Sequence, residues 1–202
     1  MILLALDLIG TFAFAITGAV KAAKRGLDWF GAIVLALATG VAGGIMRDVM
    51  LGNTPPIALQ KPIYAIVCIS AAVLIIVAQK KIISKWIFVK IADAVGLGAF
   101  TAIGAIHAET AGAGGVAIVA LAVLTAVGGG MLRDIFAGEV PQVLKTDFYA
   151  TAALIGGLFF WTFGYITDGD FHTVKVVGTI AITIILRLWA MNKKLKLPKM
   201  RG

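Results

Sequence analysis

Long apolar stretches separated by short polar segments occupy most of the chain. Seven of them have about 18–22 residues, enough for a helix to cross a hydrocarbon core roughly 30 Å thick. We place these spans at residues 2–20, 30–52, 62–79, 91–108, 115–137, 148–166 and 172–191. Pro55, Pro56 and Pro141 follow the second and fifth spans, as expected of residues that cannot continue a helix. The pattern predicts an all-α integral membrane protein with seven transmembrane helices.

Composition points to the same class of protein. Of the 202 residues, 60% are hydrophobic and only 14% are charged, and the mean hydropathy is +1.01. A soluble domain of this size does not need so much apolar surface. The 24 glycines fit the close approach of helices within a membrane. The single cysteine, Cys68, lies in an apolar run, so we expect neither a disulfide nor a thiolate metal site.

An internal repeat relates two parts of the chain at a constant offset of 86 residues. The offset pairs Asp7 with Asp93, Gly10 with Gly96, Phe14 with Phe100, Gly18 with Gly104, Thr39 with Thr125, Gly43 and Gly44 with Gly129 and Gly130, Arg47 and Asp48 with Arg133 and Asp134, Gly52 with Gly138, and Pro55 with Pro141. We therefore divide the single membrane domain 1–202 into repeat one (1–87), repeat two (88–170), an extra helix (171–192) and a basic tail (193–202). Since each copy holds three spans, the second copy is expected to be inverted in the membrane.

Basic residues are distributed unequally between the two predicted membrane faces. One face receives Lys21, Lys24, Arg25, Lys80, Lys81, Lys85, Lys90, Lys145, Lys193, Lys194, Lys196, Lys199 and Arg201, whereas the other receives only Lys61 and Lys175. Because cytoplasmic loops carry the excess of lysine and arginine, we expect a multi-pass cell-membrane protein with its N-terminus outside and its C-terminus cytoplasmic. The net charge of +8 is then a topology signal, and no nucleic-acid partner is expected.

Two similar segments lie inside the second and fifth spans: Val41–Asp48 reads VAGGIMRD and Val127–Asp134 reads VGGGMLRD. Glycine costs a helix interior roughly 1 kcal/mol relative to alanine, and a charged side chain within a membrane span costs at least about 2.5 kcal/mol. One interpretation is that the glycines break both helices at mid-membrane and expose backbone groups to a permeating species. The other is close helix packing at the glycines, with Arg47 and Arg133 as structural clamps.

If the helices break, carbonyls near Thr39–Ala42 and Thr125–Gly128 can face a cation, and the amides that follow can face an anion. The hydroxyls of Thr39 and Thr125 could add contacts, although threonine often bonds its own helix. The intramembrane ionisable residues are Asp7, Arg47, Asp48, Asp93, Arg133, Asp134 and Arg187. The four acids outnumber the three bases, which favours a cation.

Charged residues that lie at the same depth below one membrane surface are candidates for ion pairs. Asp7 and Arg47 both lie roughly 8 Å below the outer surface at 1.5 Å per residue, and Asp93 and Arg133 match them at the cytoplasmic side. We therefore expect the ion pairs Asp7–Arg47 and Asp93–Arg133. Asp48 and Asp134 compete for the same arginines, but adjacent residues point in different directions on a helix.

The sequence offers no candidate catalytic site for an intramembrane enzyme. The only serines are Ser70 and Ser84, and the only histidines, His107 and His172, are expected at the outer boundary. These few serines and histidines assemble no candidate site for a Ser-His hydrolase. An aspartyl dyad cannot form either, because the matched aspartates fall in opposite leaflets. We therefore expect no catalytic residues, no cofactor and no metal site.

The two glycine segments and the seven-span plan resemble the trimeric intracellular cation (TRIC) channels, in particular their bacterial and archaeal branch. The similarity covers about residues 1–190. It implies a homotrimer in membrane lipid in which each protomer has its own pore, lined by the second and fifth helices and passing potassium and sodium. The Lys-Glu-Val lipid-binding motif of animal members is absent, so phosphoinositide gating is not carried over. Some bacterial relatives with similar repeats are described as glycine transporters, which leaves a small amino-acid carrier as the alternative.

Overall fold

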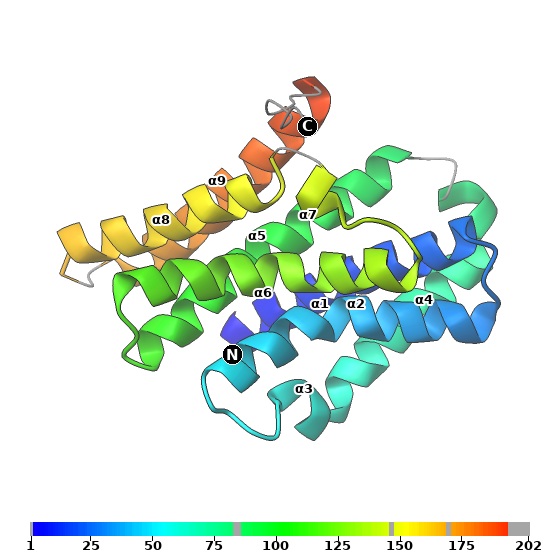
Figure 1. Ribbon diagram of the computed structural model, residues 1–202, viewed down its shortest axis with the longest axis horizontal. Coiled ribbons are helices and arrows are strands. Elements are labelled where there is room, and N and C mark those ends of the chain that lie inside the picture. The colour runs from blue at the N-terminus through cyan, green and yellow to red at the C-terminus, as the bar shows by residue number, and fades with distance from the viewer. Residues whose placement is uncertain (1, 83–85, 146–147, 169–170, 194–202) are drawn as a thin grey trace, which may run out of the picture.

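The computed structural model describes residues 2–82, 86–145, 148–168 and 171–193, without the side chains of residues 2, 79–82 and 86, and these residues form helices joined by turns and loops. Nine helices lie in these ranges: α1 (Ile2–Lys24), α2 (Trp29–Met50), α3 (Ile57–Gln60), α4 (Pro62–Ile82), α5 (Trp86–Thr110), α6 (Gly115–Phe136), α7 (Gln142–Lys145), α8 (Ala150–Ile166) and α9 (His172–Lys193) (Figure 1). Almost the whole basic tail lies outside the described residues.

Each of the seven predicted spans overlaps one of the seven long helices. Within the described residues, α1, α2, α5, α6 and α9 are long and apolar enough to cross a membrane, and α4 and α8 contain shorter apolar stretches, Pro62–Ala78 and Ala150–Ile166. The four-residue helices α3 and α7 were not predicted. The chain is therefore an all-helical, multi-pass membrane protein.

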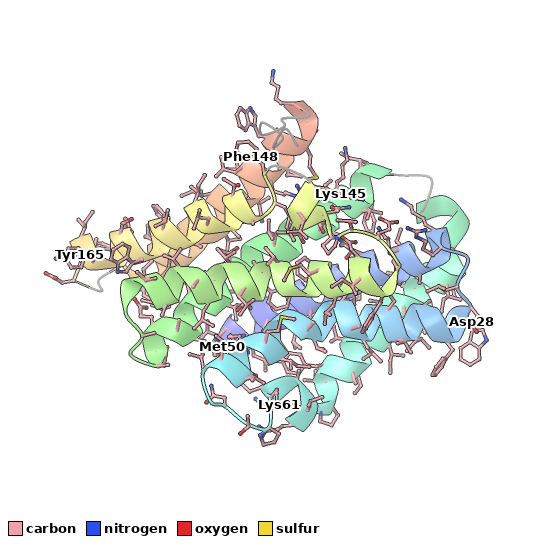
Figure 2. The ribbon with its side chains drawn as sticks, viewed as in Figure 1. Asp28, Met50, Lys61, Lys145, Phe148 and Tyr165 are labelled. Carbon is pink, nitrogen blue, oxygen red and sulfur yellow. The ribbon has the colours of Figure 1, made fainter. Side chains whose placement is uncertain are left out.

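Helices α2 and α6 lie side by side in the middle of the molecule and run in opposite directions (Figure 1). The labels of Asp28 and Met50 in Figure 2 mark the two ends of α2. Helix α1 packs on α2 as α5 packs on α6, and α1 and α5 contact each other. Helix α4 packs against α1 and α2, whereas α8 and α9 pack against α5. The two central helices are thus each covered by the other helices of their own half.

Local packing repeats at the 86-residue offset. A Cβ atom at Gly18 would lie 2.5 Å from the Leu35 carbonyl oxygen on α2, and one at Gly104 would lie 2.6 Å from the Leu121 carbonyl oxygen on α6. These contacts leave no room for a side chain, so glycine sets the distance between the first two helices of each half. In the described ranges, four glycines have positive φ, obey the same offset and end helices: Gly26, Gly52, Gly112 and Gly138.

The offset changes by one residue in the loops that follow α2 and α6. The Leu59 amide donates to the Pro56 carbonyl and the Leu144 amide to the Pro141 carbonyl, so Pro56 and Pro141 occupy the same position before a short helix. The pairing of Pro55 with Pro141, taken from the constant offset, is wrong by one residue. The second loop is one residue shorter, and a matching search without gaps cannot detect this.

Candidate functional site

The double glycines do not break their helices. Helix α2 continues from Trp29 to Met50 and α6 from Gly115 to Phe136, so the expectation of glycine-broken helices is wrong for this structure. A Cβ atom at Gly43 would lie 2.0 Å from the Thr125 carbonyl oxygen, and one at Gly129 would lie 2.2 Å from the Thr39 carbonyl oxygen. The missing side chains let the two backbones touch where α2 and α6 cross. This supports the close-packing interpretation at Gly43 and Gly129.

The second glycine of each pair has different surroundings. A Cβ atom at Gly44 would meet only the Arg47 Nη2 atom, at an ordinary contact distance of 3.8 Å. A Cβ atom at Gly130 would lie 2.6 Å from the Tyr149 hydroxyl. Backbone contact between the helices therefore requires glycine at positions 43 and 129. Gly130 makes room for the Tyr149 hydroxyl, and no close contact requires glycine at position 44.

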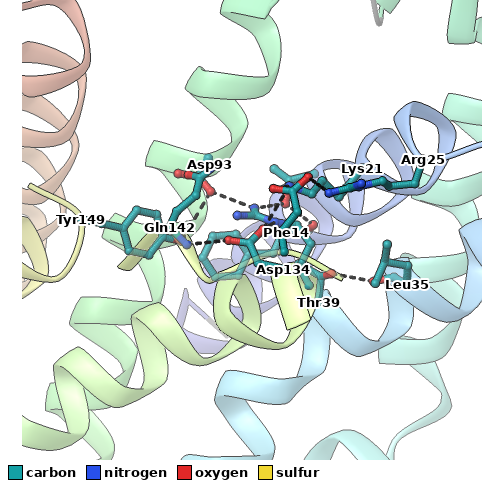
Figure 3. Close-up of polar contacts among 12 residues, drawn as sticks. Phe14, Lys21, Arg25, Leu35, Thr39, Asp93, Asp134, Gln142 and Tyr149 are labelled. Carbon is teal, nitrogen blue, oxygen red and sulfur yellow. Dashed lines mark hydrogen bonds and ion pairs between the residues drawn. The ribbon is translucent and has the colours of Figure 1, made fainter. Parts of the chain in front are cut away.

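Thr39 and Thr125 are fully buried at the crossing. Their hydroxyls donate to the Leu35 and Leu121 carbonyls of their own helices, each at 2.6 Å (Figure 3 draws the Thr39–Leu35 bond). The sequence left this alternative open, since threonine often satisfies its hydroxyl within its helix. The crossing is closed in this structure, with the Thr39 and Thr125 carbonyl oxygens facing the opposite helix.

Asp93 and Arg133 form the expected ion pair, with Arg133 Nη1 3.1 Å from Asp93 Oδ1. We call the buried group around this pair the inner cluster: Thr17, Asp93, Arg133, Asp134, Tyr149 and Arg187. Arg133 Nη1 also donates to the Thr17 hydroxyl at 3.0 Å. The Tyr149 hydroxyl donates to Asp93 Oδ1 at 3.4 Å, and Figure 3 labels both of these residues. Asp93 thereby ties α5 to α6 and to the start of α8.

Arg187 brings α9 into the inner cluster. Its Nη2 atom lies 3.2 Å from Asp93 Oδ2, and its guanidinium carbon lies 4.5 Å from the centre of the Tyr149 ring. The second oxygen of Asp93 is thus occupied by a cation from outside the two repeats.

The outer cluster differs: its members are Asp7, Arg47, Asp48 and Tyr64. The Tyr64 hydroxyl donates to Asp7 Oδ2 at 2.6 Å. Among the described residues, Asp7 and Arg47 make no ion pair, so this expectation is wrong even though both line one small cavity of about 10 Å³. Equal depth brought the two side chains to the same place, but tyrosine holds the carboxylate.

Arg47 instead binds the aspartate next to it, and Arg133 binds its neighbouring aspartate in addition to Asp93. Arg47 Nη2 lies 2.8 Å from Asp48 Oδ1, and Arg133 Nε lies 3.0 Å from Asp134 Oδ1. The expectation that adjacent residues point apart was misleading, because a long arginine side chain can fold back along its helix. The other aspartate oxygens accept the first amides of α3 and α7, from Ile57 at 2.9 Å and from Gln142 at 2.8 Å.

Tyr64 and Tyr149 were missed in the sequence. They are 85 residues apart, one fewer than the repeat offset, because the second loop is one residue shorter. A search that allowed this deletion would have paired them. They then stand out as the matched tyrosines that contact the matched aspartates.

A cavity of about 470 Å³ opens beside the inner cluster. Its polar lining consists of Thr17, Lys21, Lys24, Arg25, Lys90, Asp93, Arg133, Glu139, Gln142 and Arg187. Lys21 Nζ lies 2.7 Å from Glu139 Oε2 and 3.4 Å from Asp134 Oδ1, and Arg25 pairs with the other Glu139 oxygen (Figure 3). The hydrogen bonds from Lys21 and Arg25 hold the pKa of the Glu139 carboxyl below its ordinary value, against a smaller opposing effect of burial.

A further ion pair, between a buried lysine and a partly exposed glutamate, joins α5 to α9 away from this cavity. Lys175 Nζ lies 2.7 Å from Glu109 Oε1 and 4.3 Å from the centre of the Phe160 ring. Lys175 is 1% exposed, which its place on the predicted outer face did not indicate. A buried lysine needs such a partner, so the pair anchors the start of α9.

An apolar helical bundle with matched buried charges beside one central helix pair defines a multi-pass membrane protein built from two related halves. A family model described as "Glycine transporter" matches residues 4–80 and 90–165. The inner membrane protein YadS of Escherichia coli (strain K12), described as UPF0126, is 38% identical over 195 residues, which cover 96% of this chain and 93% of that protein.

Two solved structures are similar over nearly the whole chain. A TRIC trimeric intracellular cation channel orthologue from Rhodobacter sphaeroides is 34% identical, with a TM-score of 0.90, over 96% of this chain and 99% of that one. A structure described for conductance through TRIC cation channels is 37% identical, with a TM-score of 0.88, over 98% and 97% of the two chains. The chain belongs to the prokaryotic TRIC channel family.

Proposed function

We propose that the chain is a channel for monovalent cations, potassium and sodium, with one pathway in each protomer of a homotrimer. The observation that carries this proposal is the similarity, over 96% or more of the chain, to solved structures described as cation channels. The buried charges at both ends of the α2–α6 pair support it, because ionisable groups within a membrane are costly and mark ion pathways.

The proposed pathway follows α2 and α6. From the inner face it begins in the 470 Å³ cavity, passes the inner cluster, meets the closed crossing and ends at the outer cluster. Its residues are Asp7, Thr39, Gly43, Gly44, Arg47, Asp48, Asp93, Thr125, Gly129, Gly130, Arg133 and Asp134. Because the backbones touch at Gly43 and Gly129, this is a closed state, and opening requires the two helices to separate there.

Charge supports a cation as the permeant species. The outer cluster has two carboxylates, Asp7 and Asp48, and one guanidinium, Arg47, all buried. Its formal charge is therefore negative by one unit. A negative site in a poorly solvated place attracts cations more strongly than the same charge in water.

We also propose that seven helices span the membrane, as two inverted three-helix repeats and the additional α9. The opposite directions of α2 and α6 support the inversion (Figure 1). The orientation, with the C-terminus cytoplasmic, rests on the basic residues at one face.

In a Cys68→Ala background, Lys24→Cys should react with an impermeant reagent only from the cytoplasmic side, and Lys61→Cys only from outside. The opposite labelling would overturn the orientation, and labelling of both from one side would overturn the inversion.

The activity test is reconstitution into a planar bilayer with separate potassium and glycine gradients. A channel gives unitary currents that reverse near the potassium equilibrium potential. The second candidate is a glycine carrier, which the description of the matching family model favours. Saturable glycine uptake without unitary currents would replace the channel proposal with the carrier.

A further inference from the structure

Arg187 has no counterpart in the first repeat, since it lies on α9. It is 5% exposed, contacts Asp93 and the Tyr149 ring, and lines the 470 Å³ cavity. Its Nε atom makes no hydrogen bond with the described part of the chain. Part of this guanidinium is thus buried beside the cavity without a protein acceptor.

The matched residues of the two clusters carry equal charge without Arg187. Asp7, Arg47 and Asp48 sum to minus one, and so do Asp93, Arg133 and Asp134. All six are buried. Arg187 brings the inner cluster to zero, so the two clusters differ by one charge because of this residue. Lys21, which belongs to the cavity rim and not to the cluster, also lies 3.4 Å from Asp134 Oδ1.

The two aspartates also differ in which of their oxygens are occupied. Asp7 receives the Tyr64 hydroxyl on Oδ2. Asp93 receives Arg133 and Tyr149 on Oδ1 and Arg187 on Oδ2. Asp93 lines the large cavity, so loss of Arg187 would leave Oδ2 free beside a space large enough for a hydrated cation.

Basic residues at the rim of the cavity add to the charge difference between the two ends of the α2–α6 pair. Lys21, Lys24, Arg25 and Lys90 line it, whereas the positions 86 residues away hold His107, Thr110, Ala111 and Leu4. The rim cations are nearer solvent and are partly screened or paired, as Lys21 and Arg25 are with Glu139. Arg187 is the cation that α9 adds at the buried carboxylate itself.

We propose that Arg187 determines how readily cations enter the inner mouth, by occupying the Asp93 carboxylate that would otherwise bind them. This inference rests on the proposed channel function. The side chain acts as a tethered cation in a cation site. It lowers the local concentration of permeant ions at the inner mouth and makes conduction asymmetric.

A charge series at one position tests the proposal. Arg187→Lys keeps the charge, Arg187→Gln removes it and Arg187→Glu reverses it. The ratio of current entering at the inner mouth to current entering at the outer mouth should stay near the wild-type value for lysine. It should rise about two- to fivefold for glutamine in 0.1 M KCl, rise further for glutamate, and shrink in 1 M KCl, where charges are screened. Equal ratios for lysine and glutamine, or no change in any variant, would overturn the proposal.

A binding measurement decides the inference independently of conduction. Thermal unfolding of the purified protein is compared in KCl and in N-methylglucamine chloride of equal strength. Potassium should stabilise the Arg187→Gln variant and leave the wild type unaffected, because only the variant has a free Asp93 oxygen. Arg25→Gln is the matched control, since it removes one positive charge from the same cavity without touching Asp93. Potassium stabilisation equal in Arg187→Gln, Arg25→Gln and wild type would overturn the inference, whereas wild-type bilayers without unitary currents would overturn only the channel.

Discussion

Phe14 and Phe100 stand 86 residues apart at the same position of the two repeats, and their ring centroids lie 5.3 Å from each other. Phe14 also packs where a side chain at Gly96 would lie, and Phe100 where one at Gly10 would lie. A residue contacts its own counterpart only near the axis that relates the two copies. The proposed pseudo-two-fold axis therefore passes between these rings, and residues farther from it, such as Asp7 and Asp93, form the two separate clusters.

Replacing Gly43 with alanine should destabilise the protein, because the new methyl group would collide with the Thr125 carbonyl oxygen across the helix crossing. Overpacking of this kind costs about 1–3 kcal/mol. The adjacent Gly44→Ala variant is the control: its methyl group meets only ordinary contacts, and alanine favours a helix by about 1 kcal/mol over glycine. Thermal unfolding in detergent should therefore show a lower Tm for Gly43→Ala alone. Equal Tm values would mean that the backbones do not touch.

Asp93 and Arg133 should be strongly coupled in a double-mutant cycle of Asp93→Asn and Arg133→Gln. Each single change leaves a buried charge with fewer partners, which costs about 3–5 kcal/mol, and the double change removes both charges. Asp7→Asn and Arg47→Gln provide the comparison cycle, which should give a smaller coupling because these two side chains form no ion pair. Unfolding free energies measure both cycles, and a larger coupling for Asp7 and Arg47 would contradict the observed contacts.

Removing the hydroxyl of Tyr64 should cost more stability than removing that of Tyr149. Tyr64 bonds Asp7 at 2.6 Å, whereas Tyr149 bonds Asp93 at 3.4 Å and shares it with two arginines. A hydrogen bond to a charged group contributes about 1.5–3 kcal/mol. Tyr64→Phe is thus expected to lose about that amount and Tyr149→Phe clearly less. Unfolding of the two variants in parallel checks the order, and the reverse order would refute it.

Glu139 should stabilise the protein in a pH-dependent way. Its pKa in the folded state is lowered by the hydrogen bonds from Lys21 and Arg25, so the unfolded chain takes up the proton first as the pH falls. The stabilisation is complete above the ordinary pKa of 4.5 and is lost as the pH falls through the lowered folded value. Wild type should therefore have a higher Tm than Glu139→Gln at pH 7, and the difference should shrink as the pH falls through the lowered folded pKa of Glu139. Asp28→Asn is the control, because Asp28 caps the start of α2 and lies outside the group formed by Lys21, Arg25 and Glu139. The pH dependence assigned to Glu139 should remain in this variant.

The length of the apolar stretches was enough to predict the long helices, since each helix is dominated by apolar residues. The Asp93–Arg133 pair could also be predicted, because depth along two neighbouring helices is set by the rise per residue. The same argument failed for Asp7 and Arg47. Helix rotation and competition from Tyr64 decide which neighbour binds the carboxylate, and neither can be obtained from depth.

The role of the glycines shows a different limit. A pair of glycines in an apolar helix is compatible with a break and with close packing, and local sequence gives the same signal for both. Only the position of the opposite helix distinguishes them: Thr125 lies against Gly43 and Thr39 lies against Gly129. Likewise, the contribution of Arg187 depends on where the additional helix packs, which the repeat does not specify.

At the crossing of α2 and α6 the Thr125 carbonyl lies against Gly43 without an intervening side chain. A single side chain can change rotamer within nanoseconds, but a contact between two backbones parts only when whole helices move. Opening of the proposed channel therefore requires whole helices to move, which places the gating step in the range of about microseconds to milliseconds rather than that of side-chain rotation.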